Sequence, residues 1–208
     1  AQDFTNGRAY WHPRTGPQFV WGRIGARYHE VGGPSSPLGY PKTSEMATPD
    51  GHGRYVHFEH GSIYWTHETG AHLVMGDFMN LWGNEGWEKG RLGYPTSDRR
   101  DIPGGVVQDF QGGQIVKPAA GAPQIVLGAI GVAYRAGGGA EGPMGFALTG
   151  EFDIRDGGKF QRFEHGNIYW SAASGAHGVP DGAIMDHWGT TGWENGPFGY
   201  PVGPQKQI

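Results

Sequence analysis

The sequence has no cysteine, no surplus of basic residues and no long apolar run, and each absence excludes a class of protein. Without cysteine, the 208-residue chain forms neither disulfides nor thiolate metal sites. The formal net charge of -4 provides no positive field for a phosphate backbone, so we expect no nucleic-acid partner. No apolar segment approaches the roughly 18 residues of a membrane span, so we expect no membrane insertion.

Glycine, proline and aromatic residues are abundant instead. The chain contains 40 Gly and 15 Pro, and 13% of its residues are aromatic. This much glycine and proline indicates many turns and few long helices. Disordered segments are poor in aromatic residues, so the aromatic content indicates a packed structure. We therefore expect a folded chain that is mainly β with short helices, an α+β repeat.

Two motifs recur along the chain with a common period. A tetrapeptide appears as LGYP at 38–41 and 92–95, as MGFA at 144–147 and as FGYP at 198–201. A motif of the form F-x-x-G starts at Phe4, Phe58, Phe110 and Phe163. Both return roughly every 53 residues, which is typical of repeat proteins. We therefore expect four tandem units, at about 22–75, 76–127, 128–181 and 182–208, the last one together with 1–21.

Alternate units resemble each other more than neighbouring units do. FEHGSIYW at 58–65 and FEHGNIYW at 163–170 differ at one position. Two units, here called type B, carry a pair of tryptophans, at Trp82 and Trp87 and at Trp188 and Trp193. The other two, type A, carry Tyr28 and Tyr134 at the first of these positions and glycine at the second.

Each unit shows the pattern of a short helix. Apolar residues four apart lie on one face of a helix, and such pairs are Ile24 and Tyr28, Phe78 and Trp82, Ile130 and Tyr134, and Ile184 and Trp188. The glycines that follow end the helix, and the proline of the tetrapeptide favours an extended segment before it.

A hairpin follows in the pattern of each unit. We predict two-residue loops at Asn6-Gly7, His60-Gly61, Gly112-Gly113 and His165-Gly166. With His60-Gly61 as the loop, Phe58 would lie opposite Ile63 and Val56 opposite Trp65, on the side that we assign to the core.

A unit of this size cannot bury its apolar face alone, so neighbouring units must complete it. The chain opens with a hairpin that has no tetrapeptide and closes with a tetrapeptide that has no hairpin. We expect the first hairpin to complete the fourth unit. The whole chain, 1–208, would then be a single monomeric domain in which four units form a closed ring or tight arc with a pseudo-fourfold arrangement.

The elements LGYP, FGYP, F-x-x-G-x-I-Y-W and GAH resemble the LGFP repeat family over essentially the whole chain. The resemblance implies a module of exported proteins of mycolic-acid bacteria, including mycolyltransferases, and of lytic proteins of their phages. It implies an extracellular, cell-wall-associated location, attachment to another domain and a polysaccharide ligand of the arabinogalactan type. Phe146-Ala147 and Val116-Lys117 depart from the family pattern, so we expect a site built from these elements to be missing in the third copy.

Sugars bind to flat aromatic faces that are flanked by carboxylates, amides and imidazoles. The hairpins offer Trp11, Trp65 and Trp170, together with Glu59, His60, Glu164 and His165. The glycine-rich GWE loops offer Trp87 with Glu88 and Trp193 with Glu194. The alternative is that the tryptophans pack between units and the Glu and His side chains cap turns. Similarly, His72 and His177 of the GAH elements either line a groove or bond a backbone carbonyl.

We predict a non-catalytic carbohydrate-binding module with several weak sites, and no metal or cofactor. HEVGG at His29 lacks the second histidine of the zinc-protease motif, and no GxSxG motif occurs. A glycosidase needs two carboxylates across one cleft, whereas Glu59 and Glu164 belong to equivalent units. Two alternatives stay open: a protein-interaction platform, and a wall-polysaccharide hydrolase.

Overall fold

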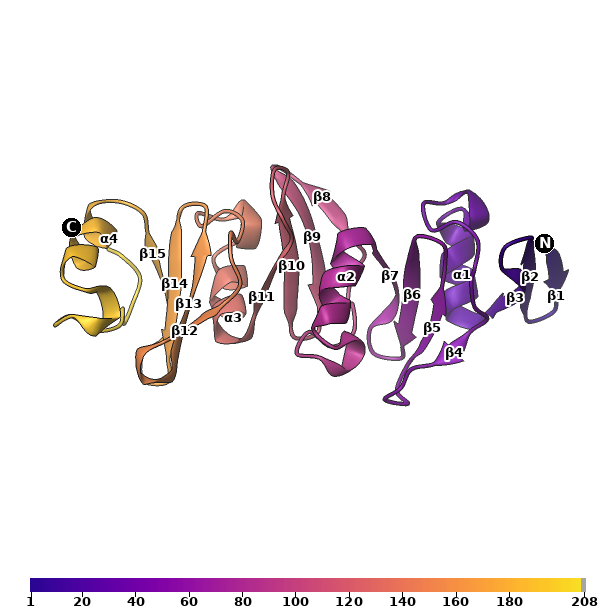
Figure 1. Cartoon of the computed structure of the whole chain (residues 1–208), viewed down its shortest axis with the longest axis horizontal. Helices are drawn as coiled ribbons and strands as arrows, with labels where there is room; N and C mark the ends of the chain where they lie inside the picture. The colour runs from indigo at the N-terminus through magenta and orange to yellow at the C-terminus, as the bar shows by residue number, and fades with distance from the viewer. Residues whose placement is uncertain (207–208) are drawn as a thin grey trace. The chain divides into compact units, whose positions relative to one another are not determined.

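The computed structural model describes residues 1–206, which form two compact units. Unit 1 comprises residues 1–99 and 108–111, and unit 2 comprises 100–107 and the described residues from 112 onward. β-sheets and short α-helices alternate along the chain (Figure 1). This confirms the prediction of four repeats that are mainly β with short helices.

Unit 1 begins with a three-stranded sheet and contains a four-stranded one. The first sheet has the order β1-β2-β3, and the second has the order β4-β5-β6-β7. The strands are β1 Gln2–Phe4, β2 Gly7–His12, β3 Gly16–Trp21, β4 Met46–Ala47, β5 Arg54–His57, β6 Gly61–Thr66 and β7 Gly70–Met75. Helix α1, Gly22–Glu30, follows β3 directly, and α2, Gly76–Asn84, follows β7.

The remaining two sheets have four strands each, in the orders β11-β10-β9-β8 and β12-β13-β14-β15. The strands are β8 Arg100–Ile102, β9 Gly105–Phe110, β10 Gly113–Pro118, β11 Gln124–Leu127, β12 Phe152–Ile154, β13 Gly158–Phe163, β14 Gly166–Ser171 and β15 Gly175–Pro180. Helix α3, Gly128–Ala136, follows β11, and α4, Ala183–Thr190, follows β15.

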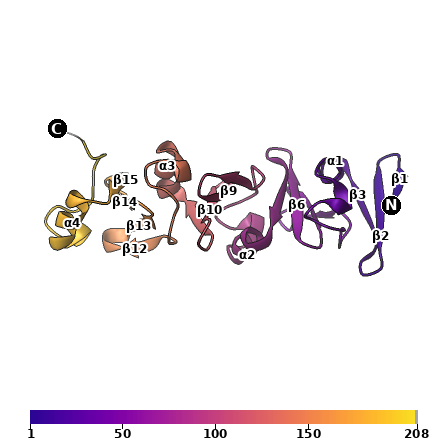
Figure 2. The same cartoon turned by 90° about the horizontal axis from the view of Figure 1, so that it is seen from above.

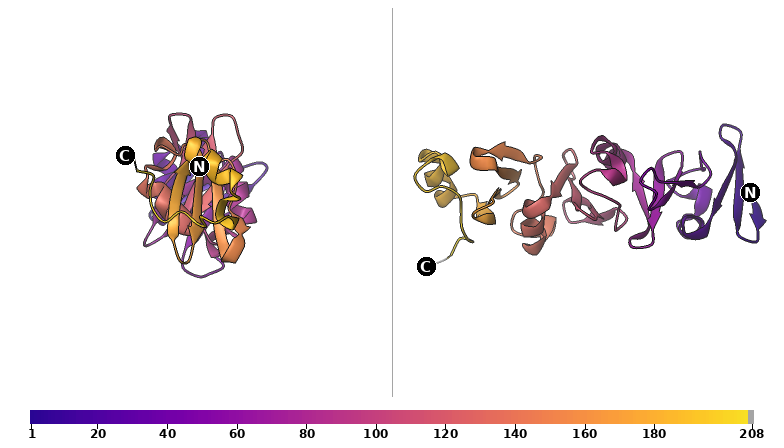
Figure 3. Two further views of the ribbon diagram at one scale, coloured as in Figure 1. Left: turned by 90° about the vertical axis from the view of Figure 1, so that its left-hand side faces the viewer. Right: turned by 90° about the horizontal axis from the view of Figure 1, so that it is seen from below.

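Each helix contacts the strand that precedes it in the chain. Figures 2 and 3 show the same elements from other sides. Helix α1 also contacts β6 and β7, and α3 also contacts β14 and β15. The helix therefore lies between two sheets, and its buried residues belong to a core to which both sheets contribute. This packing explains why one repeat cannot bury its apolar face without a neighbour.

The buried helical pairs confirm the predicted spacing in three helices, at Ile24 and Tyr28, Phe78 and Trp82, and Ile130 and Tyr134. The expectation for the fourth helix is half wrong, because Ile184 is 54% exposed and Met185 is buried beside Trp188. Helix α4 begins only at Ala183, after Gly182 with a φ of 131°, and it buries Met185 and Trp188, which are three residues apart and not four.

The predicted hairpin loops are shifted by one residue. Phe4 pairs with Gly7 and Phe163 with Gly166, and the amide of Phe58 donates to the carbonyl of Gly61, so the loop residues are those before each glycine. Val56 therefore lies opposite Ile63, and Arg54 opposite Trp65. The shift changes the partners but not the face, and Val56, Phe58 and Ile63 are buried as predicted. Closure of the chain through the first hairpin stays a prediction, as does the single domain; the described contacts place that hairpin on α1.

Candidate functional site

The tetrapeptide is held by a hydrogen bond from the preceding helix. Tyr28 Oη donates to the carbonyl of Gly39 (2.7 Å), and Tyr134 Oη donates to that of Gly145 (2.8 Å). In the type B repeat, Trp82 Nε1 donates to the carbonyl of Gly93 (3.0 Å). Tyrosine and tryptophan exchange here because each buries a ring and brings a donor to the same carbonyl.

The carboxylates at the hairpin turns also hold the tetrapeptide. Glu59 Oε2 accepts from the amide of Tyr40, and Glu164 Oε2 accepts from the amide of Phe146, both at 2.9 Å. Gln111 Oε1 accepts from the amide of Tyr94 at the same distance, so the bond needs no negative charge. The Tyr40 amide and the nearby Arg14 guanidinium lower the pKa of the Glu59 carboxyl.

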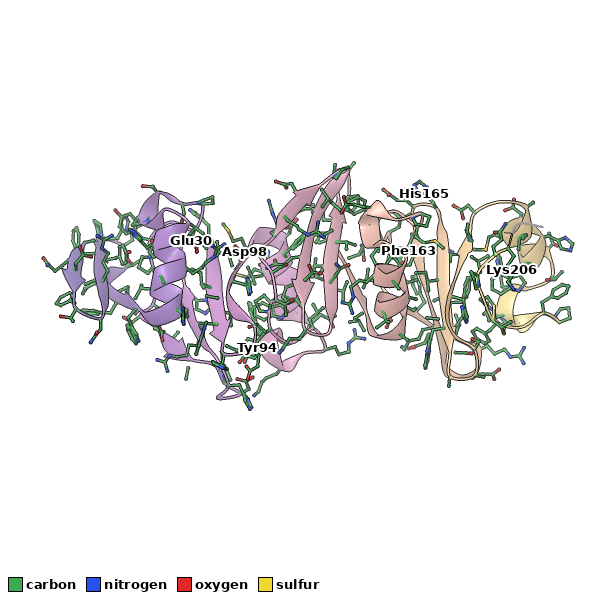
Figure 4. All side chains as sticks on the ribbon, turned by 180° about the vertical axis from the view of Figure 1, so that it is seen from behind. Glu30, Tyr94, Asp98, Phe163, His165 and Lys206 are labelled. Atoms are coloured by element: carbon green, nitrogen blue, oxygen red, sulfur yellow. The ribbon has the colours of Figure 1, made fainter. Side chains whose placement is uncertain are left out.

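The histidines of these turns are exposed. Their amides donate to the tetrapeptide, His60 to the carbonyl of Leu38 and His165 to that of Met144. His165 lies in the turn between β13 and β14, whereas Phe163, the last residue of β13, is buried (Figure 4). The Glu59 and Glu164 side chains therefore hold the tetrapeptide, whereas His60 and His165 contact it through their backbone amides and leave their rings exposed.

The hairpin tryptophans do not lie beside these turns. Trp65 pairs with Arg54 near the far end of the hairpin, six residues beyond Glu59, which is about 20 Å along a strand. Trp65 and Trp170 are half-buried against the two cores, whereas Trp11 is 63% exposed. The hairpins of Glu59 and Glu164 therefore do not bring their own tryptophan beside the glutamate and histidine of the turn.

The GWE loops, here called the Trp–Glu loops, have an unusual backbone. They are the short 3₁₀ helices Trp87–Lys89 and Trp193–Asn195. Trp87 has a φ of 58° and Trp193 a φ of 49°, in the left-handed region. A bulky side chain in this region costs on the order of 1–3 kcal/mol and marks a functional constraint more often than a neutral position.

The type A copies have the same left-handed backbone at the position of Trp87 and Trp193, but with glycine there. They carry Gly33 and Gly139, whose φ values of 57° and 62° match those of the tryptophans. Glycine adopts such angles without strain. The backbone conformation is thus common to the repeats, and the type B copies carry tryptophan in spite of it.

A second exchange accompanies the tryptophan. Its indole lies against Gly83 in one copy and Gly189 in the other, where a Cβ atom would lie 2.7 Å from Trp87 Cζ2 and 3.2 Å from Trp193 Cε2. The type A copies carry His29 and Arg135 at these helix positions. The Trp87 ring also meets the edge of Trp82, with centroids 5.3 Å apart and planes at 80°. One side of each indole stays open, since Trp87 is 36% and Trp193 47% exposed.

A glutamate that is almost fully buried follows each of these tryptophans in the sequence. Glu88 is 8% exposed, and burial first and then the charge of Asp50 raise its pKa. The charge of Glu88 in turn acts on Tyr64 and Tyr94, whose pKa values are raised mainly by burial. Tyr94 Oη, labelled in Figure 4, lies 2.7 Å from Asp50 Oδ1 and 2.8 Å from Thr48 Oγ1.

The second type B copy repeats this arrangement. Glu194 is also 8% exposed, and its Oε1 accepts from Asn195 Nδ2 at 2.8 Å. Burial and the charge of Glu194 raise the pKa of Tyr200, which donates to the carbonyl of Arg155. Each Trp–Glu loop therefore has an open indole, a nearly buried glutamate and at least one nearby tyrosine within one unit.

Sequence reasoning identified Trp87, Glu88, Trp193 and Glu194 but missed Asp50, Tyr64 and Tyr94. Tyr94 belongs to the tetrapeptide, whose repetition marks the units and not a site, and Asp50 belongs to a turn 38 residues before Glu88. Its one signal was the sequence TPDG, which is typical of a turn.

The GAH histidines form hydrogen bonds with backbone carbonyls, which is one of the two alternatives that the sequence left open. His72 Nε2 lies 2.7 Å from the carbonyl of Thr69, and His177 Nε2 lies 2.8 Å from that of Ser174. His72 also contacts Asp98, which pairs with Arg27 of α1, and Arg27 pairs with Glu30 (Figure 4). These groups join the tetrapeptide segment to α1 and β7.

Among residues 1–206 there is no group of His, Asp and Glu side chains that could hold a metal ion. No helix in the same range is long and apolar enough to cross a membrane.

The comparison with known families agrees with the repeats seen in the structure. The model of the LGFP repeat matches residues 1–36, 38–90, 92–142 and 144–196. Three of these segments begin at the first residue of the tetrapeptide, so the repeat of the family starts there and not at the helix. The comparison with curated proteins finds no match.

Proposed function

Because the chain belongs to the LGFP repeat family, we propose that it is a non-catalytic module that binds a cell-wall polysaccharide of the arabinogalactan type. Through this binding it anchors a larger, exported protein to the wall of the cell. The resemblance of its motifs to the family supports the class of ligand. The Trp–Glu loops support the binding itself.

The observation that carries this proposal is the left-handed tryptophan of each type B copy. Glycine would adopt this backbone conformation without strain, yet the type B copies carry tryptophan with one side of the indole exposed. A ligand that packs on the exposed side of the indole explains this choice. Sugar rings present C–H groups that lie on aromatic faces, and their hydroxyls donate to carboxylates. Trp87 offers such a face, and Glu88, the next residue, brings a carboxyl group that is 8% exposed.

Two equivalent loops on one chain make binding multivalent. A single contact with a sugar is weak, but a polymer that engages a second loop does so at a high effective concentration. The overall affinity for a polysaccharide then exceeds that for a short oligosaccharide by about 10²-fold or more. Multivalent binding of this kind suits an anchor, because an anchor must stay bound to the polysaccharide and need not convert it.

A wall-polysaccharide hydrolase is a second candidate, favoured by one observation. The pKa of Glu88 is raised and that of the neighbouring Asp50 is lowered, as in the acid and nucleophile of glycosidases. However, Asp50 Oδ1 accepts hydrogen bonds from the Thr48 hydroxyl, the His52 amide and Tyr94, which is the pattern of a turn cap. We therefore favour binding, and release of reducing ends from arabinogalactan would establish the hydrolase.

Co-sedimentation with purified arabinogalactan, peptidoglycan and an unrelated glucan tests the proposal. We expect the chain to sediment with arabinogalactan, and the double variant Trp87→Gly, Trp193→Gly to lose most of this binding. Trp11→Ala is the matched control, because it removes an exposed tryptophan outside the loops. The proposal fails if the folded wild-type chain does not sediment with any wall polymer. It also fails if the double variant binds as the wild type does.

A further inference from the structure

A pocket lies within unit 1, where β3 ends and α1 begins. Its volume is about 500 Å³, and Trp21, Trp65, Glu45 and Arg54 line it. A cavity of this size accommodates a small ligand. None of these four residues belongs to the Trp–Glu loops.

The floor of the pocket is a buried carboxylate that is only half satisfied. The side chain of Glu45 is 6% exposed, and its Oε1 accepts from Arg54 Nε at 2.5 Å. Its Oε2 is buried and has no hydrogen-bond partner among the described residues. Burial raises the pKa of Glu45 although Arg54 opposes this rise. An unsatisfied buried acceptor is costly, so a ligand that supplies a donor gains from meeting it.

Two tryptophans and an arginine form the walls of the pocket. Trp21, the last residue of β3, is 37% exposed, and Trp65 of β6 is half-buried. Arg54 lies opposite Trp65 in the strand pair, and its side chain is 40% exposed, so a ligand can reach its guanidinium from solvent.

The charges of the pocket select the class of ligand. Glu45 repels an anion and Arg54 repels a cation, whereas a hydroxyl group can donate to the first and accept from the second. Indole rings favour the C–H face of a sugar. We propose that this pocket binds one ring of a neutral saccharide, with a hydroxyl between Glu45 and Arg54 and its apolar face on the tryptophans. The proposal rests on the proposed function for its ligand, but on a separate set of residues.

Unit 2 provides a natural comparison. Trp170, Lys159 and Glu151 occupy the positions of Trp65, Arg54 and Glu45, but Leu127 stands where unit 1 has Trp21. Lys159 Nζ pairs with Asp153 at 2.5 Å. The second aromatic wall is thus absent there, and we expect the saccharide site in unit 1 only.

The test uses the full chain with both Trp87→Gly and Trp193→Gly. Calorimetry measures the binding of a defined arabino-oligosaccharide to this loop variant. We expect residual binding with one site per chain. Adding Trp21→Leu, the residue that unit 2 has, or Glu45→Gln weakens this binding about tenfold, as expected for losing a wall or a charged hydrogen bond. Trp11→Ala, which removes an exposed tryptophan outside this pocket, is the control and leaves the binding unchanged.

The outcomes separate the two proposals. If the wild type binds saccharide and the loop variant binds none, the pocket is not a site although the proposed function stands. If residual binding survives both Trp21→Leu and Glu45→Gln in folded protein, the assignment to this pocket is overturned. If the wild type binds no saccharide, both proposals are wrong.

Discussion

Replacing Trp87 by glycine gives a type B repeat the residue that type A repeats carry at the same backbone angle. Trp87 is 36% exposed, so about two-thirds of its surface is covered. A buried aromatic side chain hides about 150–250 Å², and about 25 cal/mol per Å² makes the covered part worth about 3 kcal/mol. Relief of the left-handed strain returns about 1–2 kcal/mol. We therefore expect Trp87→Gly to destabilise unit 1 by roughly 1–2 kcal/mol.

The affinity for polysaccharide should fall more than this modest loss of stability explains. A central aromatic contact of a binding site is commonly worth about 2 kcal/mol or more, which is about 30-fold in affinity. The double change Gly83→Arg, Trp87→Gly recreates the pair Arg135 and Gly139 of the third copy and should recover part of the stability without recovering binding. Trp87→Phe keeps a flat face and should retain part of the binding.

Two assays separate these effects. Urea denaturation monitored at 15 °C and 25 °C reports the free energy of unfolding, and affinity electrophoresis in arabinogalactan gels reports binding. The reasoning is refuted if Trp87→Gly leaves the electrophoretic retardation of the folded chain unchanged. It is equally refuted if Gly83→Arg, Trp87→Gly restores retardation, because the indole would then matter only as packing.

Other changes test the remaining parts of the structure. Glu59→Ala should lower the melting temperature by several degrees while Glu59→Gln should not, because Gln111 makes the same bond to the tetrapeptide; equal melting curves for both would contradict this role. Since the pKa of Glu88 is raised above its usual 4.5, the folded chain holds this proton after the unfolded chain has lost it. The free energy of unfolding therefore falls as pH rises through that range. In denaturation curves, Glu88→Gln should be more stable than the wild type, and the difference should grow between pH 4 and pH 7. If it does not grow, the charge of Glu88 is not buried. Hydrogen bonds from His72, the Leu73 amide and Arg27 outweigh burial and lower the pKa of Asp98 below its usual 3.8. Its contribution is present above that value and lost as pH falls below it, so Asp98→Asn should flatten the acid side of the stability curve; an unchanged acid transition would exclude this linkage.

The hairpin loops show why a glycine can be misread in a sequence. Gly61 suggested a turn position that needs a positive φ, and it is in fact the first residue of β6. A Cβ atom there would lie 2.8 Å from the carbonyl oxygen of Val74 and 2.6 Å from Met75 Cγ. The glycine is required by the close approach of β7, and that approach exists only once the sheet has formed.

The sequence by itself determined the four repeats, their alternation, the helix faces at residues such as Ile24 and Tyr28, and the tryptophans of type B. These features depend on residues close together in the chain or on a period that can be counted. Tertiary structure alone decided that Trp87 lies in left-handed backbone, that Glu59 holds a tetrapeptide 19 residues away and that Asp50, Tyr64 and Tyr94 surround Glu88. These groups meet through strand pairing and loop closure, which the spacing of a repeat does not encode.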